Sequence, residues 1–243
     1  MTTDEPYRWL EAIANRREYI RDQLKGGTPV FAFSRPEGVL LFGIGSGQSK
    51  IFEIYDRHGL AALGHPVDIE KIRQTVIEAA HLEGFNRAPE DVTLRRLLNF
   101  SLGTALKTSF DQIFSAPLMV ECIFAEVGAT QAQDALVRVS FDGTHRIAGQ
   151  GVAVAHIDSI NETAAATWLR EQVKPEMSLS QVIVHAHAAW RALIADKAFA
   201  PVLGNTTVDD ELAAAGRVVE CALLDRKITR GSRYRALTAP EMP

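Results

Sequence analysis

The stretch KGGTPVFAFSRPEGVLLF, residues 25–42, decides the predicted fold of this chain. Its glycine pair ends a preceding helical pattern, because glycine readily adopts the backbone conformation that terminates a helix. The apolar runs at 29–34 and 38–43 predict two strands, and the Arg-Pro-Glu-Gly segment between them has turn residues at suitable positions. Thr28 follows the glycines directly. It is either a nucleophile that cleavage would expose or the first residue of a strand.

Groups of strands and pairs of helices extend this pattern along the chain. Apolar residues at helical spacing predict an amphipathic helix over residues 7–25. Further strands are predicted at 51–55, 60–64, 119–128, 136–143, 151–158 and 218–225, and further helices at 68–82, 89–114, 161–172 and 179–196. Strands that arrive in hairpin groups favour antiparallel sheets with the helices on their outer faces. No linker divides the chain, so we expect one continuous α+β fold.

The composition is that of an ordinary globular protein, and it narrows the function classes. The chain has 243 residues, of which 47% are hydrophobic and 23% are charged, and its formal net charge is −4. This mild acidity argues against nucleic-acid binding. No segment approaches the roughly 18 apolar residues of a membrane span, and the N-terminus lacks the pattern of a secretory signal. We therefore expect a cytoplasmic protein with no nucleic-acid or membrane partner.

The cysteine, histidine and glycine motifs give no support for a cofactor. Cys122 and Cys221 each lie in an apolar run and are interpreted as core residues rather than a disulfide. The glycine-rich segment 43–47 resembles a phosphate-binding loop, but the residues after it predict a strand instead of the required helix. His185 and His187 are two positions apart on a predicted helix, so their side chains point to different faces. The sequence therefore predicts no cofactor and no metal site.

Four stretches are similar to one family, the α subunits of actinobacterial-type bacterial proteasomes. They are WLEAIANRREYIRDQLKGG at 9–27, SKIFEIYDRHGLAALG at 49–64, MVECIFAEVG at 119–128 and VVECALLDRKITRGSRYRALT at 218–238. The order of elements likewise resembles the wider N-terminal-nucleophile hydrolase superfamily, and the resemblance covers nearly the whole chain. It implies a four-layer αββα sandwich over residues 28–243 with a basic C-terminal tail. A gate segment and leading helix over residues 1–27 would precede this domain.

Thr28 aligns with the nucleophile of the catalytic β subunits in this family. In those subunits, cleavage between a glycine and the threonine frees an α-amino group that helps to activate the hydroxyl. Three features weigh against this role here: Pro29 restricts the backbone, Ile44 stands where catalytic subunits have an aspartate, and an amphipathic helix replaces a disposable propeptide. We expect a non-catalytic subunit. The alternative is a threonine peptidase in which Thr28 is the nucleophile and Lys50 tunes its reactivity.

The same resemblance implies a second possible role for Lys50. In α subunits a lysine at this position lines a pocket between neighbouring subunits. There it pairs with the C-terminal carboxylate of an activating ATPase, whose tail ends in a hydrophobic residue, a tyrosine and one further residue. Gly27 and Gly64 match glycines near that pocket, and His65 stands where archaeal relatives have a leucine. These four residues are the implied ATPase-docking pocket. The alternative is an ordinary lysine at a strand edge, whose charge in water contributes little.

The resemblance also implies a ring and a gate. Structural α subunits form outer rings, with seven copies expected, which template β-ring assembly and restrict access to the central channel. The gate segment would reach the axial pore, and its residues are Thr2, Thr3, Asp4, Glu5, Pro6 and Tyr7. Expected partners are further copies of this chain, a proteasome β subunit and an ATPase ring. A ring-forming scaffold without a peptidase partner is a third possibility.

Overall fold

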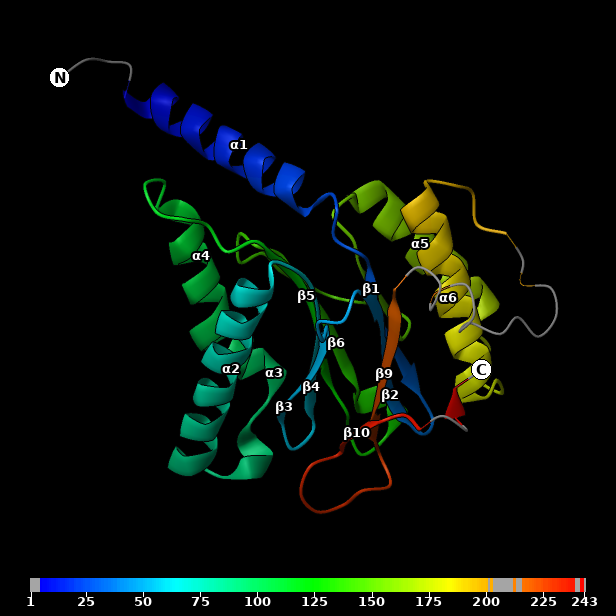
Figure 1. Ribbon diagram of the computed structural model, residues 1–243. Helices are drawn as coiled ribbons and strands as arrows, with labels where there is room; N and C mark the ends of the chain where they lie inside the picture. Colours follow the sequence, from blue (N-terminus) through cyan, green and yellow to red (C-terminus); the bar gives the residue numbers. More distant parts are fainter. Residues whose placement is uncertain (1–4, 201, 203–211, 213–215, 239–240, 243) are drawn as a thin grey trace.

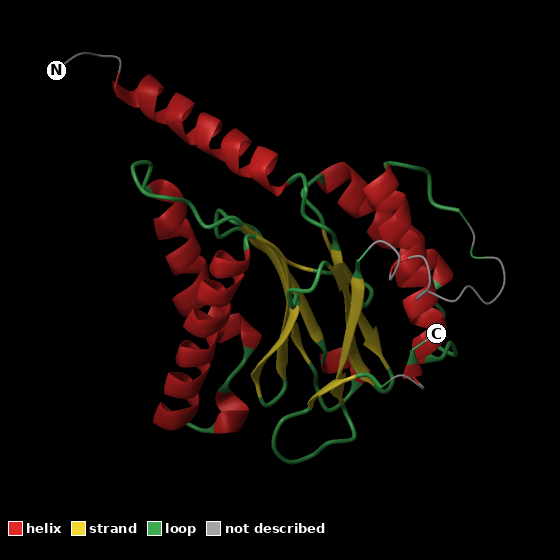
Figure 2. Cartoon of the chain, in the orientation of Figure 1, coloured by secondary structure: helices red, strands yellow, loops and turns green. Residues whose placement is uncertain are grey.

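The computed structural model describes residues 5–200, 202, 212, 216–238 and 241–242. Two five-stranded antiparallel sheets face each other, and helices cover the outer face of each sheet (Figure 1 and Figure 2). The predicted four-layer αββα sandwich is therefore confirmed. Among the described residues, no helix is both long and apolar enough to cross a lipid bilayer.

The first sheet, sheet A, combines strands from both ends of the chain. Its strands are β1 (Val30–Arg35), β2 (Gly38–Gly45), β8 (Val152–Ala155), β9 (Val218–Asp225) and β10 (Tyr234–Ala236). They lie in the order β10-β9-β2-β1-β8. The predicted hairpin of β1 and β2 thus forms the centre of the sheet, with Arg35 paired to Gly38 across the turn.

The second sheet, sheet B, follows the order of the sequence. Its strands are β3 (Ile51–Tyr55), β4 (His58–Gly64), β5 (Val120–Glu126), β6 (Ala135–Val139) and β7 (His145–Ile147). The turn between β6 and β7 contains Gly143, whose φ of 81° lies in the left-handed region that glycine adopts without strain. The short edge strand β7 was missed in the sequence because all three of its residues are exposed and give no alternating pattern.

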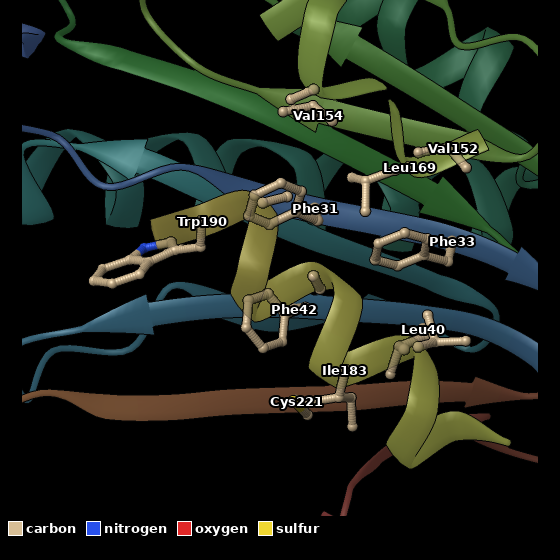
Figure 3. Close-up of a cluster of buried hydrophobic side chains, with 14 of the residues drawn as sticks. Phe31, Phe33, Leu40, Phe42, Val152, Val154, Leu169, Ile183, Trp190 and Cys221 are labelled. Atoms are coloured by element: carbon tan, nitrogen blue, oxygen red, sulfur yellow. The ribbon is translucent and has the colours of Figure 1, made fainter. Parts of the chain in front are cut away.

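The continuous apolar runs of β1 and β2 are explained by burial on both faces. Phe31 and Phe33 of β1 point to one side, where they pack with helix residues such as Trp190 (Figure 3). Val30 and Ala32 point to the other side, into the core between the two sheets. A strand that is covered on both faces needs no polar side, which is why these runs lack alternation.

The two outer layers consist of helices with one apolar face. On sheet B lie α2 (Pro66–Asn86), α3 (Leu94–Leu97) and α4 (Gly103–Asp111), and on sheet A lie α5 (Ser159–Gln172) and α6 (Leu179–Ala195). Cys122 packs in the sheet B layer and Cys221 in the sheet A layer, and both are free and buried. The interpretation of these cysteines as core residues is confirmed.

The predicted helix over residues 89–114 is wrong at its start. Residues 89–91 form a single 3-10 turn, and the helical segment begins at Leu94. Thr93 caps this start with its side chain, and the carboxylate of Glu126 accepts a hydrogen bond from the backbone N–H of Leu94 at 2.8 Å. A π-helical turn at 98–102 then leads into α4, which ends at Asp111.

Helix α1 (Glu5–Leu24) lies across one end of the sandwich (Figure 1). Its last turns are part of the inter-sheet core, because Ile20 and Leu24 are buried there. Arg16 donates hydrogen bonds to the carbonyls of Ser109, Ile113 and Ser115. The C-terminal half of the helix is thus held firmly by the body of the protein.

Candidate functional site

A pocket of about 410 Å³ opens where the end of α1, the loop after β2 and the end of β4 meet. Gly27, Lys50 and Gly64, three of the four residues expected at an ATPase-docking pocket, line it together with Thr28. The fourth, His65, follows Gly64 and is exposed, but it does not line the pocket. We call this hollow the Lys50 pocket.

Two glycines allow the walls of the Lys50 pocket to come close together. Gly64 has a φ of +140°, and a Cβ atom at this position would lie 2.1 Å from the carbonyl oxygen of Met119. A Cβ atom on Gly27 would lie 3.0 Å from both the Leu24 carbonyl oxygen and a methyl group of Leu63. Side chains at either position would push the walls apart, so glycine is a steric requirement of the site.

Lys50 lies just before β3 and its side chain is largely buried. Its ammonium group donates hydrogen bonds to the backbone carbonyl and the hydroxyl of Thr28. Burial lowers the pKa of Lys50 to about 8, an effect opposed by the negative charge of Glu220 and increased by the positive charge of Arg217. Lys50 is therefore expected to lose its proton at mildly alkaline pH.

Thr28 is tied into the end of sheet A. Its hydroxyl donates a hydrogen bond of 2.6 Å to the carbonyl oxygen of Ile44, sixteen residues further along. Ile44 is the position where a catalytic subunit would have an aspartate. A backbone carbonyl accepts a hydrogen bond but cannot serve as a base, and the isoleucine side chain points into the core of sheet A and α6.

Two charged residues at the site were missed in the sequence. The carboxylate of Glu220 on β9 accepts a hydrogen bond from the backbone N–H of Lys50 at 2.9 Å, although 170 residues separate them. Arg217, just ahead of β9, lines the pocket. Glu220 lies in the predicted strand at 218–225, but nothing in the sequence assigns it or Arg217 to the pocket, since both reach the site only through the pairing of β9 with β2.

The six residues of the proposed gate segment are only partly described. Thr2, Thr3 and Asp4 lie outside the described residues. Glu5, Pro6 and Tyr7 form the first turn of α1, so the helix begins two residues earlier than the sequence pattern predicts.

The Lys50 pocket has the chemistry of an anion-binding site. It offers one buried ammonium group and one guanidinium group, while Pro66 and Ile69 supply apolar surface. A short anionic peptide end would suit this combination. Within the described part of the chain, no group of three or more His, Cys, Asp or Glu side chains is arranged to hold a metal ion.

The sequence is similar to several curated proteins named proteasome subunit alpha. It is 31% identical over 242 residues to the protein of Paenarthrobacter aurescens (strain TC1), which covers 96% of this chain and 92% of the relative. Identity to the protein of Arthrobacter sp. (strain FB24) is 30% over 231 residues, covering 92% and 88%. Identity to the protein of Jonesia denitrificans is 29% over 237 residues, covering 95% and 92%. No family model matches the chain.

Proposed function

This chain belongs to the proteasome α-subunit family, and from that premise we propose that it forms the outer, heptameric ring of a cytoplasmic bacterial proteasome core particle. Its αββα sandwich is the N-terminal-nucleophile hydrolase fold of that family. The ring would template β-subunit assembly, restrict access to the channel and bind an ATPase ring. The subunit itself would contribute no active site.

The burial of α1 is the observation that carries the non-catalytic role. Ile20 and Leu24 are 0% and 2% exposed in the core between the sheets. Cleavage between Gly27 and Thr28, which a threonine peptidase needs, would leave this core open if the released helix departed. Each apolar side chain of this size contributes about 1.5–3 kcal/mol when buried. The leading helix is thus suited to remain part of the mature subunit.

Native mass spectrometry of the purified chain, with an intact denatured mass alongside, tests this proposal. We expect a full-length chain in a ring of seven copies, and capture of a proteasome β subunit when one is supplied. A chain that begins at Thr28, or one that stays monomeric with and without a β subunit, would contradict the proposal.

The contact between Lys50 and Thr28 favours a second candidate, a threonine peptidase with Thr28 as nucleophile. A neighbouring amine can activate a hydroxyl, and the two groups are hydrogen-bonded here. Replacing Thr28 with alanine separates the two candidates. In a particle assembled with β subunits, we expect the rate of peptide hydrolysis to stay unchanged, because the β subunits supply the active sites. Loss of all hydrolysis in this variant, with the particle still assembled, would favour the second candidate.

Deletion of residues 2–7 is expected to speed peptide hydrolysis by the assembled particle several-fold. The deleted segment would otherwise crowd the axial pore with seven copies of its acidic residues Asp4 and Glu5, so the gate would be only marginally closed. Hydrolysis of a short fluorogenic peptide measures the effect. Replacing Asp4 and Glu5 with their amides is the matched control, and it should slow hydrolysis because it removes like-charge repulsion. An unchanged rate after the deletion would remove the gating role.

A further inference from the structure

Arg217 is a pocket-lining cation for which neither the proposed function nor the family resemblance assigns a role. It lies in the Lys50 pocket, and its guanidinium carbon lies 5.0 Å from the centre of the Trp190 ring. Such a cation–π contact attracts the guanidinium to the ring face without neutralising its positive charge. Within the described residues, no carboxylate forms an ion pair with Arg217. Among the described residues, the guanidinium thus keeps its charge uncompensated by an ion pair while it lies against the Trp190 ring.

Lys50 is similarly left without a carboxylate at its ammonium group. Its described hydrogen-bond acceptors are the two oxygens of Thr28, both formally neutral. The nearest acidic residue in this network, Glu220, directs one oxygen to the backbone N–H groups of Lys50 and Ile51, at 2.9 and 3.4 Å. Two basic residues from distant parts of the chain thus line one pocket. In the described part of the chain, the acidic residue beside them, Glu220, accepts hydrogen bonds from the backbone.

We propose that Arg217 and Lys50 together bind the terminal carboxylate of a docking peptide, with Arg217 as a second, specificity-determining cation. This rests on the proposed docking function and extends it. A guanidinium group binds a carboxylate through two parallel hydrogen bonds, whereas an ammonium group acts as a point charge. The apolar wall formed by Pro66 and Ile69 would contact the side chain next to the carboxylate.

The electrostatics of the pocket give this arrangement a measurable signature. The charge of Arg217 lowers the pKa of Lys50, which burial has already lowered, to about 8, while Glu220 acts in the opposite direction. Binding needs the protonated lysine, so affinity should be highest well below pH 8 and fall as the pH rises through about 8. Removal of Arg217 removes one cause of the lowered pKa. The fall in affinity should then begin at a higher pH.

The test measures binding of a fluorescein-labelled heptapeptide ending in Leu-Tyr-Leu to the assembled ring, at constant ionic strength between pH 6.5 and 9.5. At pH 7 we expect Arg217→Gln to raise the Kd about tenfold, as for loss of one charge-assisted hydrogen-bonding partner. The decline at alkaline pH should also move to higher pH. The same peptide with an amidated C-terminus should bind poorly to both proteins. Arg230→Gln is the matched control, because Arg230 is exposed and does not line the pocket.

The outcomes separate this inference from the docking function on which it rests. If Arg217→Gln binds the peptide like the unmodified protein while Lys50→Gln does not, docking stands and the role of Arg217 is wrong. If Arg217→Gln weakens binding without a shift of the pH profile, Arg217 only supports the pocket wall, and the shared-carboxylate arrangement is wrong. If the unmodified ring binds the free and the amidated peptide equally well, both proposals fail.

Discussion

Replacing Arg138 with methionine is expected to lower the free energy of unfolding by about 3–5 kcal/mol, as for removal of one partner from a buried ion pair. Arg138 on β6 is 6% exposed and lies between two buried carboxylates, Glu121 on β5 and Glu162 on α5. Its removal would leave both carboxylates in the protein interior without their main countercharge. Urea unfolding of the unassembled chain, followed by tryptophan fluorescence, measures the loss.

Arg146 provides the matched control for this prediction. It also pairs with Glu162, but its side chain is 60% exposed. Arg146→Gln should therefore cost much less than Arg138→Met, because an exposed guanidinium is screened by water and Glu162 keeps its pairing with Arg138. Equal losses in the two variants would show that burial of Arg138 is not the cause.

The loss caused by Arg138→Met should also depend on pH. Burial already raises the pKa of Glu121, and Arg138 opposes that effect. Without the arginine, Glu121 should have a pKa well above the ordinary value of about 4.3 in the folded protein. The folded variant then binds more protons than the unfolded chain, so its stability increases as the pH falls. The deficit relative to the unmodified protein should be smaller at pH 5 than at pH 7.

If the proposed docking function holds, Lys50→Gln is expected to weaken binding of the docking peptide by about 2–5 kcal/mol, the range for loss of one partner of a desolvated charge pair. This corresponds to a Kd increase of at least about thirtyfold. Glutamine keeps hydrogen-bonding capacity towards Thr28 but removes the positive charge. Binding of the heptapeptide ending in Leu-Tyr-Leu measures the change, and native mass spectrometry checks that the ring remains assembled.

Lys71 on α2 is the control for a general effect of charge. It is an exposed lysine outside the pocket, so Lys71→Gln should change the Kd less than twofold, in line with the small contribution of exposed charges. A loss of similar size in both variants would mean that the overall charge of the surface governs binding. The specific role of Lys50 would then be wrong.

The leading helix and the central hairpin of sheet A could be predicted from the sequence because they depend on short-range patterns. The glycine pair after the leading helix and the apolar runs of β1 and β2 predict the hairpin at the centre of sheet A, and this prediction is confirmed. The family resemblance drawn from four stretches is likewise confirmed by the relatives. Local pattern failed near Pro89, where proline and two acidic residues imitate a helix start. The actual start at Leu94 depends on the Glu126 carboxylate, which lies 32 residues away in the chain.

Only some of the pocket residues could be predicted from the sequence, because the others reach the pocket through long-range strand pairing. Lys50, Gly27 and Gly64 were proposed through the family resemblance, and the structure brings them to one pocket. Arg217 and Glu220 join them only when β9 pairs with β2, and nothing in the surrounding residues indicates that pairing. The hydrogen bond from the Thr28 hydroxyl to the Ile44 carbonyl likewise depends on the folded sheet, which brings the two residues together.

The different strand orders of the two sheets affect how the protein folds while it is being synthesised on the ribosome. Sheet B needs only one contiguous stretch, from β3 to β7, so its pairings can form while later segments are still being synthesised. Sheet A cannot close until β9 and β10 emerge, because β2 has its outer neighbour at residues 218–225. Until then the edge of β2 that pairs with β9 stays unpaired, and other strands or other chains can pair with it instead. We therefore expect nascent chains that stop before residue 218 to depend on chaperones, and those released after β10 to fold unaided.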